Sequence, residues 1–236
     1  MGGCSRKMCS EHVFTKGVFT GQPLRWTGGG MTFMQGREVT PANLKAKVLC
    51  VTHNSALHEL DDEAIRLANA LRVLLAAKQQ GNNAVRVDGW KIERWCMKCG
   101  CNVLASGWAE GHGFAPDPQI VRAIFGVCRL PSGAGLYGLL DPMVKLISDA
   151  DQVGFTLFER SPAAIVGVYI QMHGLGLIVS SYTGDITAAL RGAKNLGNVP
   201  TPDWSAARVM HHPHSVELFR NLAPGEKASL TLEFAW

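Results

Sequence analysis

Three cysteines lie within one short stretch of the sequence, Cys96-Met97-Lys98-Cys99-Gly100-Cys101. A Cys-x2-Cys pair followed by glycine is typical of a turn that directs two thiolates at one zinc ion, and a structural zinc site takes four sulfur or imidazole ligands. The sequence has no second pair at this spacing, so the remaining ligands must come from elsewhere. We predict a structural zinc site held by Cys96, Cys99, Cys101 and His112.

Other residues offer the same ligand chemistry, and a site without metal is the alternative. The other candidate ligands, all distant in sequence, are Cys128, Cys4, Cys9 and His12. Without zinc, the cluster is a set of reduced, partly buried cysteines, which behave as small apolar residues. The cofactor prediction is therefore either none or structural zinc.

The same cysteines also suit nucleophilic catalysis. A thiol reacts at neutral pH when an imidazole lies close enough to take its proton, and His112 in Gly111-His112-Gly113 is the nearest histidine along the chain. No third residue that would orient this imidazole stands out. The pattern keeps open a cysteine-dependent or zinc-assisted hydrolase that uses the Cys96–Cys101 cluster with His112.

Two further groups of histidines match known motifs less well. His58-Glu59 begins like the helical motif of zinc proteases, but Asp62 stands where that motif has its second histidine. His211-His212-Pro213-His214 offers imidazoles for a transition metal or a pH-sensitive element, although Pro213 interrupts regular geometry. Because no carboxylate or thiolate pattern stands beside these three histidines, we interpret the stretch as a solvated loop.

The clearest element in the sequence is a helix that begins at Leu60. Acidic residues stand in its first turn, where the helix dipole favours them, and Gly81 is expected just past its end. Its apolar residues recur with helical spacing at Ala64, Leu67, Ala68, Leu71, Leu74 and Leu75. This spacing predicts a helix with one buried face. Shorter helices are expected after Asp117-Pro118, Asp141-Pro142 and Thr201-Pro202.

Strands are expected before and after the cysteine cluster. The stretch from Ala84 to Trp95 alternates like one or two strands with a kink at Gly89. Three apolar strands are predicted at 155–159, 164–172 and 175–182. A hairpin of Ser215 to Arg220 and Ala228 to Trp236 ends the sequence. Together these elements predict a single α+β domain over residues 1–236, with a β-sandwich-like, jelly-roll type sheet core and helical insertions in its connections.

Composition narrows the classes of function. Only 18% of the 236 residues are charged, against about 25% in ordinary soluble domains, so part of the surface is expected to be covered by copies of the chain. The net charge of +4 is spread out, so nucleic acid is a partner to consider but no basic arm announces it. No apolar run reaches the roughly 18 residues of a membrane span. Seven cysteines, an odd number, are expected to be reduced, which favours a cytoplasmic chain or an assembled particle over a secreted one.

The terminal hairpin carries the one resemblance to a known family. From Ser215 to Trp236, two strands around Leu222-Ala223-Pro224-Gly225-Glu226 loosely resemble the closing strands of jelly-roll viral coat proteins. The sequence departs from the usual coat pattern because it lacks a long basic arm. With the low charge, this resemblance implies a self-assembling structural subunit, of the kind that forms a viral capsid, and a homo-oligomer. The alternative is the hydrolase described above.

Overall fold

The computed structural model describes residues 7–19, 24–25, 38–39, 44–106, 117–140, 153–161, 164–181, 183–191, 194–197 and 208–236. Several predictions fall outside these ranges. They concern His112, Cys4, and the starts of the helices expected after Asp141-Pro142 and Thr201-Pro202.

The helices in the described ranges are α1 (Val51–Ser55), α2 (His58–Ala76), α3 (Gly89–Ala105), α4 (Pro118–Ile124) and α5 (Ile186–Arg191). The predicted long helix is confirmed as α2, and all six residues of its apolar stripe are buried. Gly81, however, opens the next strand rather than ending the helix. The start of α4 is also confirmed, because the Asp117 side chain accepts a hydrogen bond from Gln119 N at 2.7 Å. None of these helices has both the length and the apolar character needed to cross a membrane.

The largest described sheet is antiparallel throughout. Its order is β10 (Lys194–Gly197), β7 (Val153–Ser161), β8 (Ala164–Met172), β9 (Leu175–Ser180), β6 (Gly135–Leu140) and β11 (Arg208–His211). The three predicted apolar strands are confirmed as β7, β8 and β9, which follow one another in the sheet. His173 and Gly174, both with positive φ, form the tight turn between β8 and β9.

A second described sheet has three strands, β12 (Ser215–Asn221), β13 (Lys227–Ala235) and β5 (Gly81–Asp88). The predicted terminal hairpin is confirmed as β12 and β13. The strand prediction for Ala84 to Trp95 is wrong in its second half, because β5 ends at Asp88 and α3 begins at Gly89. The Asp88 side chain accepts a hydrogen bond from Lys91 N at 3.0 Å and so starts the helix.

Two further described pairs are small. β1 (Met8–His12) pairs with β4 (Lys45–Cys50), and β2 (Leu24–Arg25) pairs with β3 (Glu38–Val39), both antiparallel.

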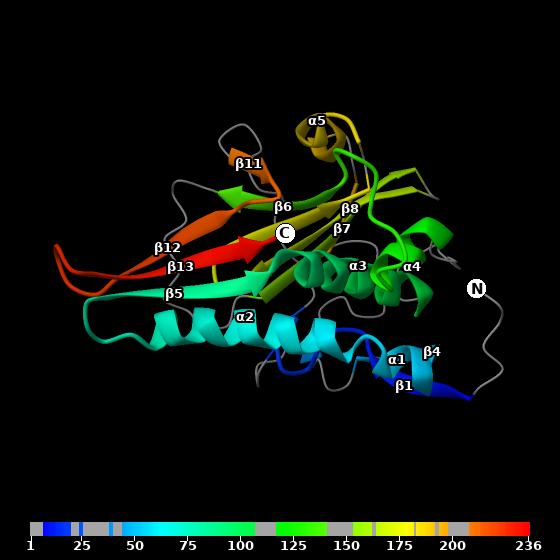
Figure 1. Ribbon diagram of the computed structural model, residues 1–236, viewed down its shortest axis with the longest axis horizontal. Helices are drawn as coiled ribbons and strands as arrows, with labels where there is room; N and C mark the ends of the chain where they lie inside the picture. Colours follow the sequence, from blue (N-terminus) through cyan, green and yellow to red (C-terminus); the bar gives the residue numbers. More distant parts are fainter. Residues whose placement is uncertain are drawn as a thin grey trace.

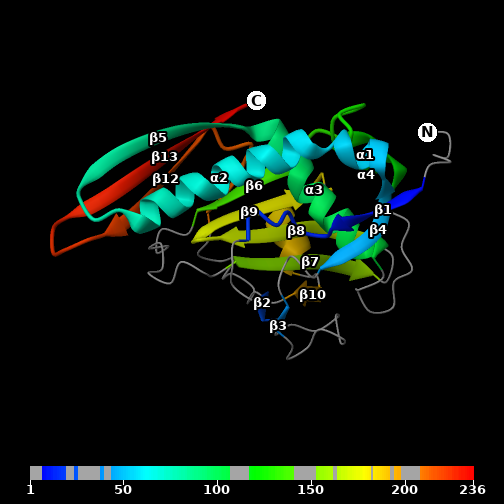
Figure 2. The same ribbon diagram turned by 90° about the horizontal axis from the view of Figure 1, so that it is seen from below.

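The helices join the two main sheets (Figures 1 and 2). α3 contacts β6, β8 and β9 of the six-stranded sheet and also packs against α2. α2 in turn contacts all three strands of the smaller sheet, and α5 contacts β8 from the other side of the six-stranded sheet. One cluster of buried apolar side chains runs through these layers.

The α+β fold with a sheet core is confirmed. The sandwich or jelly-roll arrangement and the single domain over the whole chain stay predictions. The parallel pairing of β5 with β13 differs from the antiparallel sheets of a jelly roll.

Candidate functional site

The cysteine cluster lies on a helix, not on the metal-binding turn that its spacing suggested. Cys96 and Cys99 are buried within α3, and Cys101 is half-buried. Burial raises the pKa of both the Cys96 and Cys99 thiols well above the usual value, and burial raises the pKa of Cys101 to about 12. Within the described ranges, no group of three or more His, Cys, Asp or Glu side chains is arranged to hold a metal ion. The zinc set with His112, and the hydrolase that shares it, therefore stay predictions.

The small residues of this cluster have a packing role. Cys96 and Cys99 belong to the apolar core, and Gly100 faces Val168 of β8. Short side chains at these positions let α3 approach the sheet closely. This contact fixes the depth at which the polar residues of α3 lie.

A different group of polar side chains comes together near the start of α3. Glu93 is 3% exposed, and its Oε2 atom accepts a hydrogen bond from Leu136 N at 2.8 Å and shares a second hydrogen bond with His212 Nε2 at 3.0 Å. His212 N donates to Leu136 O at 2.8 Å. Glu93, Leu136 and His212 thus form a closed ring of three hydrogen bonds that joins α3 to β6 and to the corner after β11.

Aromatic rings enclose the His212 side of this group. The His212 ring stacks between His211, with ring centres 4.0 Å apart, and Trp236, at 4.2 Å. The Trp90 ring stands roughly perpendicular to both the His212 and the Trp236 rings, with ring centres 5.2 Å apart in each case. The guanidinium carbon of Arg129 lies 4.1 Å from the centre of the Trp90 ring. We call Glu93, Trp90, His211, His212 and Trp236 the Glu93–His212 cluster.

The backbone around the Glu93–His212 cluster is unusual at two positions. His212 has φ of 41°, a left-handed conformation that costs energy in a residue with a side chain. Gly135 has φ of 138°, and a Cβ placed there would lie 2.6 Å from His212 Nε2 and 2.8 Å from Glu93 Oε2. Only glycine at position 135 leaves room for the hydrogen bond between Glu93 and His212.

Burial controls the proton affinity of the pair. Desolvation raises the pKa of Glu93 to about 7, although the Leu136 hydrogen bond and the charges of His211 and Arg129 act in the opposite direction. Desolvation lowers the pKa of His212 below its usual value, and Arg129 and His214 lower it further. Because the two groups are in contact they titrate as a pair, and with the pKa of Glu93 raised to about 7 the pair exchanges a proton with solvent near neutral pH.

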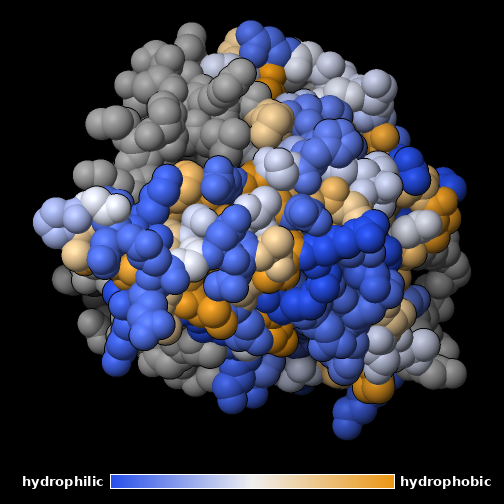
Figure 3. Space-filling model, turned by 60° about the vertical axis from the view of Figure 1, so that its left-hand side comes forward, coloured by the Kyte–Doolittle hydropathy of each residue, from blue (hydrophilic) through white to orange (hydrophobic). Residues whose placement is uncertain are grey.

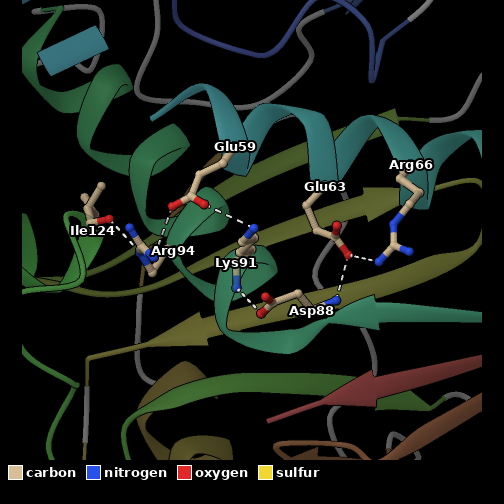
Figure 4. A network of polar contacts seen from close by, with 7 residues as sticks. All are labelled: Glu59, Glu63, Arg66, Asp88, Lys91, Arg94 and Ile124. Atoms are coloured by element: carbon tan, nitrogen blue, oxygen red, sulfur yellow. Dashed lines mark hydrogen bonds and ion pairs between the residues drawn. The ribbon is translucent and has the colours of Figure 1, made fainter. Parts of the chain in front are cut away.

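Polar contacts with α2 fix the first turns of α3 (Figure 4). Glu63 Oε1 accepts a hydrogen bond from Asp88 N at 2.6 Å, and Lys91 Nζ lies 3.1 Å from Glu59 Oε2. Arg94 Nε donates to Ile124 O at 2.7 Å and so ties the same turn to the end of α4. These contacts flank Glu93 on the helix and set its direction.

A second buried polar group lies further along α3. Lys98 Nζ lies 2.7 Å from Asp61 Oδ2 on α2 and 3.0 Å from Glu11 Oε1 on β1. Burial lowers the pKa of Lys98, but the charges and hydrogen bonds of Asp61 and Glu11 outweigh it, so the pKa is raised overall. This triad ties β1 to the two long helices, α2 and α3.

The interpretation of His211 to His214 as a solvated loop is wrong for His212, which is half-buried against Trp236. The missing partner was Glu93, which the sequence analysis did not single out. The sequence does contain a pattern that could have identified Glu93. On a helix, Glu93 lies on the same face as Gly89, Ile92, Cys96, Gly100 and Val103. A charged residue within a buried helix face is rare unless it is paired.

Comparisons of this chain with protein-family models, with curated proteins and with solved structures found no match.

Proposed function

We propose that this chain is a self-assembling structural subunit, and that copies associate through the open edge of β12. The observation that carries the proposal is the position of β12 at the end of its sheet. Among the described strands, none pairs with its outer side. A seven-residue edge strand presents unpaired backbone N–H and C=O groups and is a template for pairing with another chain.

The hairpin register identifies the backbone groups that face outward. Leu222 N donates to Glu226 O and Phe234 N donates to His214 O, so even-numbered residues of β12 pair with β13. Odd-numbered residues of β12 therefore direct their backbone N–H and C=O groups away from β13, toward the open edge of the sheet. These residues are Ser215, Glu217, Phe219 and Asn221.

A second copy of the chain fits this edge. Two antiparallel β12 strands related by a twofold axis perpendicular to the sheet bring odd-numbered residues opposite odd-numbered ones, as the outward hydrogen bonds require. The same symmetry keeps the apolar faces together, so Val216 and Leu218 of both copies continue one buried layer. The strand has no proline or lysine to block pairing, and Glu217 and Arg220 balance in charge.

Further edges support a larger assembly. β5 ends the other side of the same sheet, while β10 and β11 end the six-stranded sheet. The hairpin tip and β5 project together at one end of the molecule (Figure 1). From that side, hydrophobic residues are scattered among hydrophilic ones (Figure 3). Backbone pairing therefore explains association on this face better than a large apolar patch does. We further propose that the assembly is a shell of the viral coat type. The sequence resemblance of residues 215–236 supports this, whereas the parallel pairing of β5 with β13 departs from a jelly roll.

Sedimentation velocity over a range of protein concentrations tests the proposal. The variant Glu217→Pro removes an outward N–H without touching the β13 ladder, so association should fall at least about tenfold. Glu217→Ala keeps the N–H and should associate like the wild type. Equal association of the two variants, or a wild type that is monomeric at all concentrations, would overturn the proposal.

The cysteine-dependent or zinc-assisted hydrolase is the alternative hypothesis. The high pKa of the buried Cys96 and Cys99 thiols disfavours the thiolates that this chemistry requires. The zinc content of the purified protein, compared with that of Cys99→Ser, tests the metal part directly. One zinc ion per chain that is lost in the variant would restore this hypothesis.

A further inference from the structure

We propose that the Glu93–His212 cluster is a proton-controlled latch that fixes the corner between β11 and β12, and with it the position of the β12 edge, and that loss of its proton weakens subunit association. This inference rests on the proposed function, because the surface that the latch controls is the β12 edge.

The latch lies where the chain passes from one sheet to the other. β11 ends at His211 in the six-stranded sheet, and β12 begins at Ser215 in the three-stranded sheet. His212, with its left-handed backbone, makes the corner between them. The hydrogen bonds from His212 to Glu93 and Leu136 therefore fix the direction in which β12 leaves the corner.

Contacts around the corner connect it to both strands of the hairpin, β12 and β13. Pro213 O accepts a hydrogen bond from Trp236 Nε1 at 3.0 Å, and His214 O accepts one from Phe234 N at 2.9 Å. The Trp236 ring also stacks on His212 and packs against Gly89 at the start of α3. A shift of His212 therefore moves the start of β12 and the end of β13 together.

The charged groups around Glu93 define what a change of protonation does. His211 and His212 face it from the corner, Arg129 acts on it from the segment between α4 and β6, and the Cys96 thiol lies on its own helix. His214 acts on His212. With Glu93 protonated and His212 neutral, the ring of hydrogen bonds buries no net charge. With Glu93 ionised, a negative charge is buried at this position. The neighbour in direct contact that can form an ion pair with it is His212, and only when His212 is itself charged.

An ionised carboxylate in a low-dielectric site is strongly disfavoured, and exposing it to water removes this free-energy cost. Opening the latch breaks the bond to His212 and releases the corner. Between pH 6 and pH 8, a carboxyl group with a pKa of about 7 passes from mostly protonated to mostly ionised. If only the closed latch presents β12 for pairing, the closed fraction of each copy falls about tenfold over this range. Both copies of a pair must be closed, so the dissociation constant of the pair rises about a hundredfold.

The test measures association of the full chain by sedimentation velocity at pH 6, 7 and 8. Association of the wild type should weaken about a hundredfold from pH 6 to pH 8, and association of Glu93→Gln, which stays neutral, should show no such change. Glu226→Gln removes an exposed carboxylate of the hairpin turn and should follow the wild type. A Glu93→Gln protein that weakens with pH as the wild type does would overturn the proposal.

Two measurements separate failure of the latch from failure of the proposed function. If the wild type does not associate at any pH, the proposed function fails. The latch can then still be tested in the monomer, by amide hydrogen exchange of β12 corrected for the intrinsic exchange rates. Loss of protection from pH 6 to pH 8 in the wild type supports it, and unchanged protection overturns it. Should Glu93→Gln not fold, carbon-13 NMR of glutamate carboxyl groups in the wild type replaces it, because no carboxyl group titrating near neutral pH would also overturn the latch.

Discussion

A Cβ atom added to Gly100 would lie 2.6 Å from Cγ2 of Val168, so the backbone of α3 lies almost in contact with β8. Such a distance is too short for ordinary carbon atoms, so any side chain at this position must push the helix and the sheet apart. Gly100 stands between Cys99 and Cys101, so the cysteine cluster lies where the helix approaches the sheet closely.

Gly100→Ala should lower the free energy of unfolding by about 1–3 kcal/mol, because overpacking a dense core forces shifts of backbone and side chains. Urea unfolding monitored by circular dichroism measures this loss. Gly81→Ala is the matched control, since a Cβ there would meet nothing within 4 Å, and its stability should be unchanged or slightly higher. Equal stabilities of the two variants would contradict the packing role.

Lys98→Met should lower the free energy of unfolding by about 3–5 kcal/mol, because it leaves the Glu11 and Asp61 carboxylates without their buried partner. The same denaturation assay measures the loss. Arg66→Met provides the comparison, since Arg66 pairs with Glu63 while half of its side chain is exposed, and its removal should cost less than about 1 kcal/mol. Similar losses in both variants would show that the Lys98 triad adds little.

The stability of the wild type should fall as the pH rises from 5 to 8. Glu93 binds its proton more tightly in the folded chain, with a pKa of about 7, than in the unfolded chain, so its contribution is complete at low pH and lost as the pH rises through 7. The difference in unfolding free energy between wild type and Glu93→Gln should change by about 3 kcal/mol across this range. His212 acts in the other direction, because its lowered pKa removes stability as the pH falls below about 6.5. A constant difference between the two proteins would refute the assignment.

Gly135→Ala should destabilise the protein more than Gly225→Ala. Both glycines have positive φ, so both substitutions introduce backbone strain of about 1 kcal/mol. Only at Gly135 would the new Cβ also meet His212 Nε2 and Glu93 Oε2, whereas at Gly225 it would meet nothing within 4 Å. Thermal unfolding of the two variants compares them, and equal shifts of Tm would count against a tight ring around Glu93.

Cys96 and Cys99 should resist alkylation in the native protein, because both are buried and their raised pKa values keep them as thiols. Cys9 and Cys128 are half-buried and should react first among the described cysteines. Mass-spectrometric mapping after a short exposure to iodoacetamide measures this order. Rapid modification of Cys99 would instead support the cysteine-dependent hydrolase.

Local periodicity was sufficient to predict much of the fold. The confirmed predictions are the helix α2, the strands β7, β8 and β9, and the terminal hairpin. In each case the signal was a run or a spacing of apolar residues within one helix or one strand. Such patterns depend only on residues close in sequence, so they can be recognised without knowledge of the tertiary structure.

The Glu93–His212 cluster could not be predicted in this way, because its members are far apart in the chain. His212 follows Glu93 by 119 residues, and their hydrogen bond depends on α3, whose first turns, up to Trp95, fall in the stretch that the sequence predicts as strand. The sequence predicts a kink in a strand at Gly89, but Gly89 begins the helix and lies against the ring of Trp236. Nothing near Gly89 in the sequence indicates that contact.

The parallel pairing of β5 with β13 also bears on how the chain is made. Gly81 pairs with Ala228, so β5 leaves the ribosome long before the strand that completes its sheet has been synthesised. During that interval α3 and β5 can pack against α2, but the part of its apolar face that contacts β12 and β13 has no cover, and pairings of such long range are slow to form. Newly made chains are therefore open to premature contacts with one another, and the yield of folded protein should depend on chaperones that shield α2 until β13 arrives.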